Sequence, residues 1–282
     1  MDKRKLLNII DLNFNPKGII GGYESIALKR KWNGIAYMDI SISKHIPNAD
    51  KLVQDNIVFL DKEYENAYII ERVAEKLEGN STMLSIQATH INCLLRDYIT
   101  IPPTGQDTDA VTDIREVIAR TWVDHNCINP ADATRVQYPI ILGTLNNIGQ
   151  SIKESTRYKN LADEIIALLS VEQLGWNVTI DVTNKKFVFN VLKGVDRSYA
   201  QSENPRILFG TKYGNLSGYE RVDDKTSEKN IAYVGGQGEG KDRVVTKVVK
   251  TGITRKKEMF VDARDLADAA SLPERGNQSL EE

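Results

Sequence analysis

The sequence predicts an α+β fold in which two β-rich regions flank a helical segment. Residues 1–100 contain short runs of β-branched and aromatic residues separated by turn signals, which is typical of strands. In the middle of the chain, apolar residues recur three and four positions apart, the spacing of an amphipathic helix. After Gly175 the apolar period changes to two, as in strands with one buried face. The order of the regions is therefore β, then α, then β.

Residues 1–100 are predicted to form a small β-barrel-like or sandwich domain, because short strands alternate with turns. Asn33-Gly34 between two apolar runs is the strongest short hairpin signal in this region. Asn15-Pro16-Lys17-Gly18 is predicted to be another turn, and residues 90–98 a short helix that closes the domain. Strands are expected at 6–12, 25–31, 37–43, 56–60, 67–76 and 83–89.

Residues 101–174 are predicted to be a helical insert, preceded by a break at Pro102-Pro103-Thr104-Gly105. Helices are expected over 109–124 and 160–171, with a loop over 126–149. The first helix is predicted from an apolar stripe formed by Val111, Ile114, Val117, Ile118 and Trp122. Its opposite face is expected to be a solvated surface that carries Asp113, Arg115, Glu116 and Arg120.

Residues 175–282 are predicted to form a second β-rich domain. Apolar residues alternate over 176–182 and 187–191 around the turn Thr183-Asn184-Lys185, which predicts a hairpin with paired apolar side chains. Further strands are expected at 206–210 and 256–261, and a helix is expected from Ala263. Residues 271–282 are polar and contain Pro273 and Gly276, so they are not expected to close a domain.

The run Gly235-Gly236-Gln237-Gly238-Glu239-Gly240-Lys241-Asp242 satisfies all but the last position of the phosphate-loop pattern. Asp242 stands where a magnesium-binding hydroxyl belongs. The β-branched run at 244–249 predicts a strand where phosphate binding needs a helix N-terminus. We therefore predict a β-hairpin over 230–249, with a structural role for its glycines and no cofactor site. These glycines are Gly235, Gly236, Gly238 and Gly240.

Composition bounds the classes of function. The 282 residues suffice for one large or two ordinary domains. Lys and Arg total 37 against 39 Asp and Glu, a net charge of −2, so no bulk positive charge points to nucleic-acid binding. No apolar run approaches the ~20 residues of a membrane span, and the N-terminus does not resemble a signal peptide. We expect no membrane anchoring and synthesis in a cytoplasm.

Catalytic patterns are weak in this sequence. It contains no G-x-S-x-G nucleophile turn and no H-E-x-x-H metalloprotease pattern. Two nitrogen–sulfur pairs, His90 with Cys93 and His125 with Cys127, could in principle form a tetrahedral zinc site. Ordinary buried thiols are the preferred interpretation. No catalytic or metal-binding residue is assigned.

Several motifs resemble one family when they are taken in order along nearly the whole chain. They include Trp32 and Gly34 near the N-terminus and Gly175-Trp176-Asn177-Val178 after the second predicted helix. The glycine-rich loop followed by Arg243, and the later run Phe260-Val261-Asp262-Ala263-Arg264-Asp265, are the most specific pair. Together they resemble the tail proteins of long-tailed, non-contractile phages and prophages, whose fold is similar to the baseplate hub of T-even phages.

The resemblance implies a structural protein of the tail tip without enzymatic activity. Hub proteins of this kind have two β-barrel-like domains that alternate around a homotrimeric ring, which joins the tail tube to the tip and lets DNA pass. The implied partners are other copies of the chain, distal tail or tube proteins, and tip or fibre proteins, within the virion. Such proteins continue into further strands, so the second domain is expected to be incomplete at its C-terminus.

Two alternatives stay open at this point. Some proteins that resemble this one carry a tail-associated cell-wall hydrolase, and exposed tyrosines are also typical of recognition surfaces. The chain could therefore be a cell-wall hydrolase or a module that binds host carbohydrate or another receptor.

Overall fold

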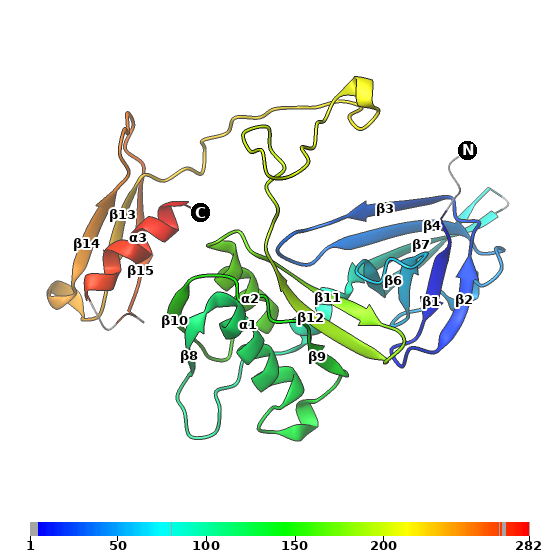
Figure 1. Cartoon of the computed structure of the whole chain (residues 1–282), viewed down its shortest axis with the longest axis horizontal. Helices are drawn as coiled ribbons and strands as arrows, with labels where there is room; N and C mark the ends of the chain where they lie inside the picture. The colour runs from blue at the N-terminus through cyan, green and yellow to red at the C-terminus, as the bar shows by residue number, and fades with distance from the viewer. Residues whose placement is uncertain (1–4, 80, 265, 267–268, 282) are drawn as a thin grey trace. The chain divides into compact units, whose positions relative to one another are not determined.

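The computed structural model describes residues 5–79, 81–264, 266 and 269–281, and the chain forms two compact units. The first unit is Met1–Asp196 and the second is Arg197–Glu282 (Figure 1). The division falls between residues 196 and 197, where the sequence predicts boundaries after 100 and after 174. Each unit has its own sheets and core, so each is described by itself. Among the described residues, no helix is both long and apolar enough to cross a bilayer.

A seven-stranded antiparallel sheet forms the first half of unit 1. Its spatial order is β2-β1-β5-β6-β7-β4-β3, so β2 and β3 are its edges. Within the described residues these edges do not pair with each other, and the predicted barrel is therefore seen only as an open sheet. The strands are β1 (Leu7–Ile10), β2 (Pro16–Ile20), β3 (Ser25–Lys29), β4 (Tyr37–Ser43), β5 (Ile57–Leu60), β6 (Ala67–Glu78) and β7 (Ser81–His90).

The predicted strands of residues 1–100 are confirmed to within a few residues, but the turn predicted at 15–18 is wrong. Pro16–Ile20 forms β2, paired with β1. The chain turns earlier, where the Asp11 carboxylate accepts hydrogen bonds from the backbone of Asn13 at 2.9 Å and of Asn15 at 2.8 Å. An edge strand tolerates Pro16 because one row of its N–H groups needs no ladder partner.

Two apolar clusters lie on the two faces of this sheet. Alternation along β5 sends Val58 and Leu60 into one cluster, and Ile57 and Phe59 into the other. The first cluster is closed by residues of the sheet itself and of a short 3₁₀ turn at Ala49–Lys51. The second cluster is shared with residues from 91 to 191. The helical segment therefore packs in one core with the N-terminal sheet.

The second half of unit 1 covers that shared face (Figure 1). A 3₁₀ helix at Ile91–Asp97 follows β7, as the sequence predicts a short helix there. Strand β8 (Asp109–Ile114) pairs antiparallel with β10 (Ser151–Thr156). The hairpin of β11 (Gly175–Asp181) and β12 (Lys186–Leu192) is confirmed, and β9 (Ile140–Leu142) adds to it in parallel. The helices are α1 (Arg115–Val123) and α2 (Leu161–Ser170), with a π-helical turn at Asp124–Ile128.

The helix predicted over 109–124 is corrected at its start, because residues 109–114 form β8. The loop predicted over 126–149 contains β9. The supposedly solvated face is also partly internal, since Arg115 and Glu116 are buried. The Glu116 carboxylate accepts from the backbone N–H groups of Asn146 at 2.8 Å and Ile148 at 3.0 Å. Its charge thus organises the connection that follows β9.

Between β12 and β13 (Ile231–Gly235) the chain contains one short 3₁₀ turn, Thr211–Tyr213, and the strand predicted at 206–210 is wrong. The Asn215 side chain donates to the carbonyl oxygen of Leu208 at 2.8 Å and accepts from the Gly210 N–H at 3.0 Å. These local bonds satisfy backbone groups that a strand would offer to a neighbour.

Unit 2 has a three-stranded sheet in the order β14-β13-β15. Strand β13 (Ile231–Gly235) runs antiparallel to β14 (Val245–Val249) and parallel to β15 (Glu258–Asp262). The helix predicted from Ala263 falls partly on residues 265, 267 and 268, which lie outside the described residues. The prediction that 271–282 closes nothing is wrong: Leu272–Glu281 forms α3, which buries Leu272 and Leu280 against the sheet.

Candidate functional site

The glycine-rich loop joins two paired strands. The pairing runs from Ile231 opposite Val249 to Gly235 opposite Val245, as predicted. A 3₁₀ turn at Gly240–Asp242 and then β14 follow the loop, so the residues after Lys241 present no α-helix N-terminus to a phosphate. Gly238 has φ 104°, and a Cβ there would lie 2.7 Å from the Asp242 carbonyl oxygen. The loop thus needs glycine for its backbone geometry, and its part in assembly stays a prediction.

Arg243 fastens this loop to β15. Its guanidinium donates to the carbonyl oxygens of Gly235 at 2.8 Å and Gly236 at 3.0 Å, and pairs with the Asp262 carboxylate. It also lies over the Phe260 ring, 5.2 Å from the centroid. Partial burial tends to raise the pKa of Asp262, but its bond to Arg243 outweighs this and the pKa lies below the usual range. The two most specific motifs of the family resemblance therefore meet in space.

Sequence reasoning missed this contact between Arg243, Phe260 and Asp262. The reason is that β15 pairs directly with β13 in parallel, although β14 separates the two strands in the sequence. Parallel pairing leaves no local turn signal. The one sign in the sequence was that the glycine-rich loop with Arg243 and the run that begins at Phe260 both resemble the same family.

One face of the unit 2 sheet is open. Register places Tyr233, Lys247 and Phe260 side by side on the face opposite α3. Phe260 is 57% exposed, and Val245 and Val249 on the same face are about half exposed. The Lys247 ammonium lies 5.4 Å from the centroid of the Tyr233 ring. We call this surface the open sheet face.

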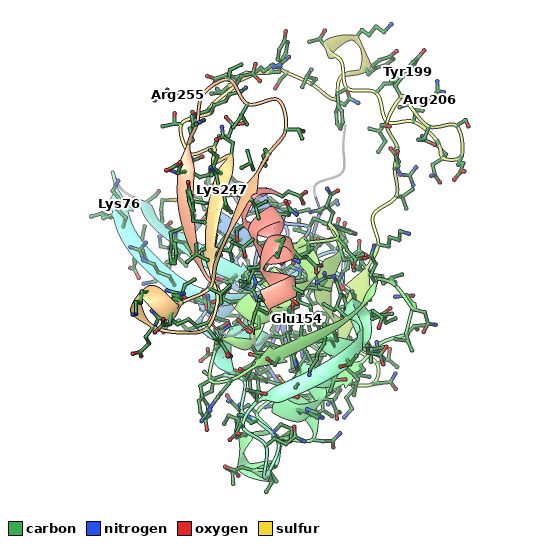
Figure 2. The ribbon with its side chains drawn as sticks, turned by 90° about the vertical axis from the view of Figure 1, so that its left-hand side faces the viewer. Lys76, Glu154, Tyr199, Arg206, Lys247 and Arg255 are labelled. Atoms are coloured by element: carbon green, nitrogen blue, oxygen red, sulfur yellow. The ribbon has the colours of Figure 1, made fainter. Side chains whose placement is uncertain are left out.

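The segment 193–230 also exposes large apolar side chains. Figure 2 shows Tyr199 and Arg206 in this segment, and the Arg206 guanidinium lies 4.6 Å from the centre of the Tyr199 ring. Tyr219 is 86% exposed and Phe209 is 71% exposed. Exposed aromatic residues are enriched at surfaces that contact other proteins.

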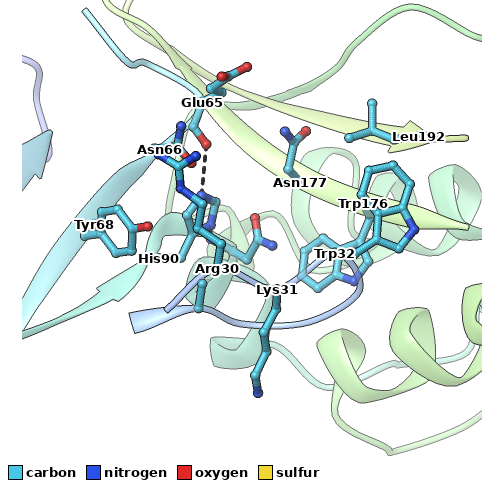
Figure 3. A pocket seen from close by; sticks show the side chains of 12 residues that line it. Arg30, Lys31, Trp32, Glu65, Asn66, Tyr68, His90, Trp176, Asn177 and Leu192 are labelled. Carbon is cyan, nitrogen blue, oxygen red and sulfur yellow. Dashed lines mark hydrogen bonds between the residues drawn. The ribbon is translucent and has the colours of Figure 1, made fainter. Parts of the chain in front are cut away.

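A cavity of about 310 Å³ lies in unit 1 beside the loop that joins β3 to β4 (Figure 3). That loop is held in place by hydrogen bonds to distant backbone. The Trp32 Nε1–H donates to the Gln173 carbonyl oxygen at 2.9 Å, and Asn33 Nδ2 donates to that of Ile166 at 3.0 Å. Asn33-Gly34 thus belongs to the β3–β4 hairpin connection and also docks it onto α2 and its C-terminal turn. The cavity is lined by Arg30, Lys31, Trp32, Ala36, Glu65, Asn66, Tyr68, His90, Asn92, Trp176, Asn177 and Leu192.

Buried Asn92 lies in the cavity wall and links the β3–β4 loop to β11. Its Nδ2 donates to the Gly34 carbonyl oxygen at 2.9 Å, and its Oδ1 accepts from the Val178 N–H at 2.7 Å. Each end of this amide therefore binds backbone. The Tyr68 hydroxyl and the Trp176 Nε1–H, by contrast, are buried without a hydrogen-bond partner among the described residues.

The two histidine–cysteine pairs are placed as structural groups. His90 Nε2 lies 3.0 Å from the Glu65 carbonyl oxygen, its Nδ1 accepts from Asn92 N, and burial lowers its pKa. Burial raises the pKa of Cys93 to about 12. His125 Nδ1 lies 3.0 Å from a carboxylate oxygen of buried Asp109. In the part of the chain that the structure describes, no three His, Cys, Asp or Glu residues are grouped to hold a metal ion.

The fold is that of prophage tail proteins. The prophage MuSo2 43 kDa tail protein from Shewanella oneidensis has a TM-score of 0.59 and 11% identity, over 98% of this chain and 78% of that one. The prophage tail protein gp18 from Listeria monocytogenes has a TM-score of 0.52 and 14% identity, over 96% of this chain and 76% of that one. A tail protein from Neisseria meningitidis has a TM-score of 0.51 and 13% identity, over 97% of this chain and 74% of that one. Identities this low establish a shared fold and no more.

The family is established by sequence. The profile of the family described as Siphovirus ReqiPepy6 Gp37-like protein matches residues 6–282. The chain therefore belongs to this siphovirus family, and the predicted resemblance is confirmed. Among curated proteins, none is similar enough to match.

Proposed function

We propose that this tail protein is a structural subunit of a ring-shaped hub at the tail tip. Three copies form the ring, which joins the tail tube to the distal tip and lets DNA pass. Its partners are other copies of itself, tube or distal tail proteins, and tip or fibre proteins in the virion. The role is structural rather than enzymatic.

The open sheet face is the observation that carries this proposal. An apolar sheet face is normally buried against another element, but α3 covers only one face in unit 2, and the other face exposes Val245, Val249 and Phe260. Within the described residues, β14 and β15 each pair only with β13 and leave their outer edges unpaired. Such edges aggregate unless another chain or strand covers them. A closed ring of identical subunits covers them by repeated contacts between unlike surfaces.

Two further properties support the ring. The exposed aromatic residues of 193–230 add apolar area for a neighbour, as the large exposure of Phe209 and Tyr219 indicates. The net charge of −2 suits a channel for DNA, because a strongly basic lining would hold phosphates. The two β-rich units are then the two hub domains that alternate around the ring.

The test is the mass and symmetry of the assembled protein. Light scattering coupled to size-exclusion chromatography should give three copies of the 31.7-kDa chain, and electron-microscopy class averages should give threefold rings. Phe260→Ser on the open sheet face should yield monomers with unchanged circular dichroism. Leu77→Ser is the matched control, because it also removes an exposed apolar side chain but lies outside the open sheet face. The control should keep the assembly intact.

A monomeric wild-type chain at high concentration contradicts the proposal. Lytic activity of that monomer on cell walls would favour the hydrolase in its place. Rings that form equally well with Phe260→Ser would show that the open sheet face is not the contact.

A further inference from the structure

The cavity beside Trp32 has the size of a small-ligand site. Its volume of about 310 Å³ lies at the lower end of the range for ligand pockets, which is enough for one sugar ring. All of its lining residues belong to unit 1, so its shape does not depend on the placement of the second unit. Ligand binding in this cavity therefore does not require ring assembly.

The Tyr68 hydroxyl is the strongest sign of a ligand. The side chain is fully buried, yet its hydroxyl has no hydrogen-bond partner among the described residues. A buried hydroxyl without a hydrogen-bond partner lowers the stability of the fold unless a ligand or water supplies that partner. In Figure 3 the hydroxyl points toward the side chain of Arg30. Burial raises the pKa of Tyr68, and both the charge of Arg30 and its close approach to the hydroxyl oppose this.

The charges that line the cavity favour an anion. Arg30 and Lys31 are positive, although the Lys31 ammonium lies over the Tyr37 ring, 5.7 Å from its centroid, and Glu65 is the only carboxylate in the lining. One guanidinium nitrogen of Arg30 donates a hydrogen bond to the Glu63 carboxylate at 3.2 Å. The guanidinium has further N–H donors. A carboxylate accepts two bonds at once, so it can take one from Arg30 and one from the Tyr68 hydroxyl.

Trp32 supplies a fixed aromatic wall. Its ring is 47% exposed, and its Nε1–H is held by the Gln173 carbonyl oxygen. The ring also lies directly on Gly175, where a Cβ would come within 2.5 Å of it. A rigid, half-exposed aromatic face packs well against the C–H face of a sugar ring at low entropic cost.

We propose that this cavity binds one carboxylate-bearing monosaccharide unit. Its carboxylate lies between Arg30 and the Tyr68 hydroxyl, and its ring packs on Trp32. Asn66 and Asn177 at the wall contact ring hydroxyls. The site would let a tail protein hold an acidic polysaccharide while its assembly contacts lie elsewhere.

The probe is sodium D-glucuronate, titrated into the full chain and followed by saturation-transfer NMR, with D-glucose and sodium acetate as separate arms. A ligand of this size should bind with a dissociation constant of about 1 mM. Glucose and acetate should each bind at least about tenfold more weakly, because glucose lacks the carboxylate and acetate lacks the sugar ring. Tyr68→Phe and Arg30→Gln should each weaken glucuronate binding by about tenfold.

Thermal unfolding separates a binding role from a structural one. Tyr68→Phe removes an unpaired buried hydroxyl, so its melting temperature should equal or exceed that of the wild type while glucuronate binding falls. Tyr158→Phe, an exposed tyrosine in the same unit, is the matched control and should change neither. No saturable signal up to about 50 mM, far above the expected constant, would overturn the proposal. Equal binding of acetate or glucose, or unchanged binding by Tyr68→Phe, would do the same.

Discussion

Single residues hold this chain together by binding backbone that is distant in sequence. Asn92 joins Gly34 to Val178, and Arg243 joins the glycine-rich loop to Asp262. In each case one polar side chain satisfies groups that would otherwise be buried without partners. Such residues are expected to be sensitive to substitution even where they carry no chemistry.

Asp11 gives a pH-dependent prediction at this scale. Partial burial tends to raise the pKa of Asp11, but Lys17 and the Asn13–Asn15 bonds outweigh it and lower the pKa well below its usual value. A carboxyl whose pKa is lowered by folding stabilises the protein above its unfolded pKa of about 3.9, and that stability is lost as the pH falls further. Asp11→Asn should therefore lower the melting temperature at pH 7, and the difference from wild type should shrink toward pH 3.

Asp39→Asn is the matched control, because Asp39 is an exposed carboxylate in the same sheet. It should leave the melting temperature unchanged at both pH values. A constant Asp11→Asn difference between pH 7 and pH 3 would show that the charge of Asp11 is not what holds the turn.

At the scale of elements, α3 is held on its sheet by a glycine. A Cβ at Gly276 would lie 2.7 Å from Val248 Cγ2 and 2.8 Å from Val234 Cγ2, and these branched side chains have little freedom to move. Replacing glycine by alanine inside a helix normally adds about 1 kcal/mol of stability. Gly276→Ala should instead destabilise unit 2 by about 1–3 kcal/mol, because the helix is pushed from the sheet.

Hydrogen exchange measured by mass spectrometry checks this prediction. The amides of β13 should exchange faster in Gly276→Ala, while those of β4 in unit 1 keep their rates. Asn277→Ala, at an exposed position of the same helix, should leave β13 protected as in the wild type. Slower exchange of β13 in Gly276→Ala would mean that helix propensity outweighs the close packing.

At the scale of the whole molecule, the division at 196/197 predicts which pieces fold. Phe187, Phe189 and Trp176 of the β11–β12 hairpin are buried in the core that α1 and α2 share with the first sheet. A chain of residues 1–196 should therefore unfold in one cooperative transition in urea. A chain of residues 1–174 should not, because it lacks the hairpin that closes this core. Equal cooperativity of the two chains would place the boundary at 174, as the sequence predicts.

The sequence alone determined the elements whose signals are local. Alternating apolar residues around Thr183-Asn184-Lys185 predicted the β11–β12 hairpin, and the β-branched run after Lys241 predicted a strand rather than a phosphate-binding helix. The family was also within its reach, since the motifs that carry the resemblance are continuous segments. These signals are local because turn chemistry and side-chain periodicity act between near neighbours.

Only the tertiary structure decided what distant partners impose. The apolar spacing of residues 109–114 predicted a helix. They form a strand because their backbone pairs with β10. The polar stretch with Gly276 became a helix that closes unit 2, because a missing side chain permits close packing. The Trp32 cavity and the Arg243–Asp262 contact arise in the same way. Backbone pairing and close packing depend on what lies opposite in space, and no local pattern records that.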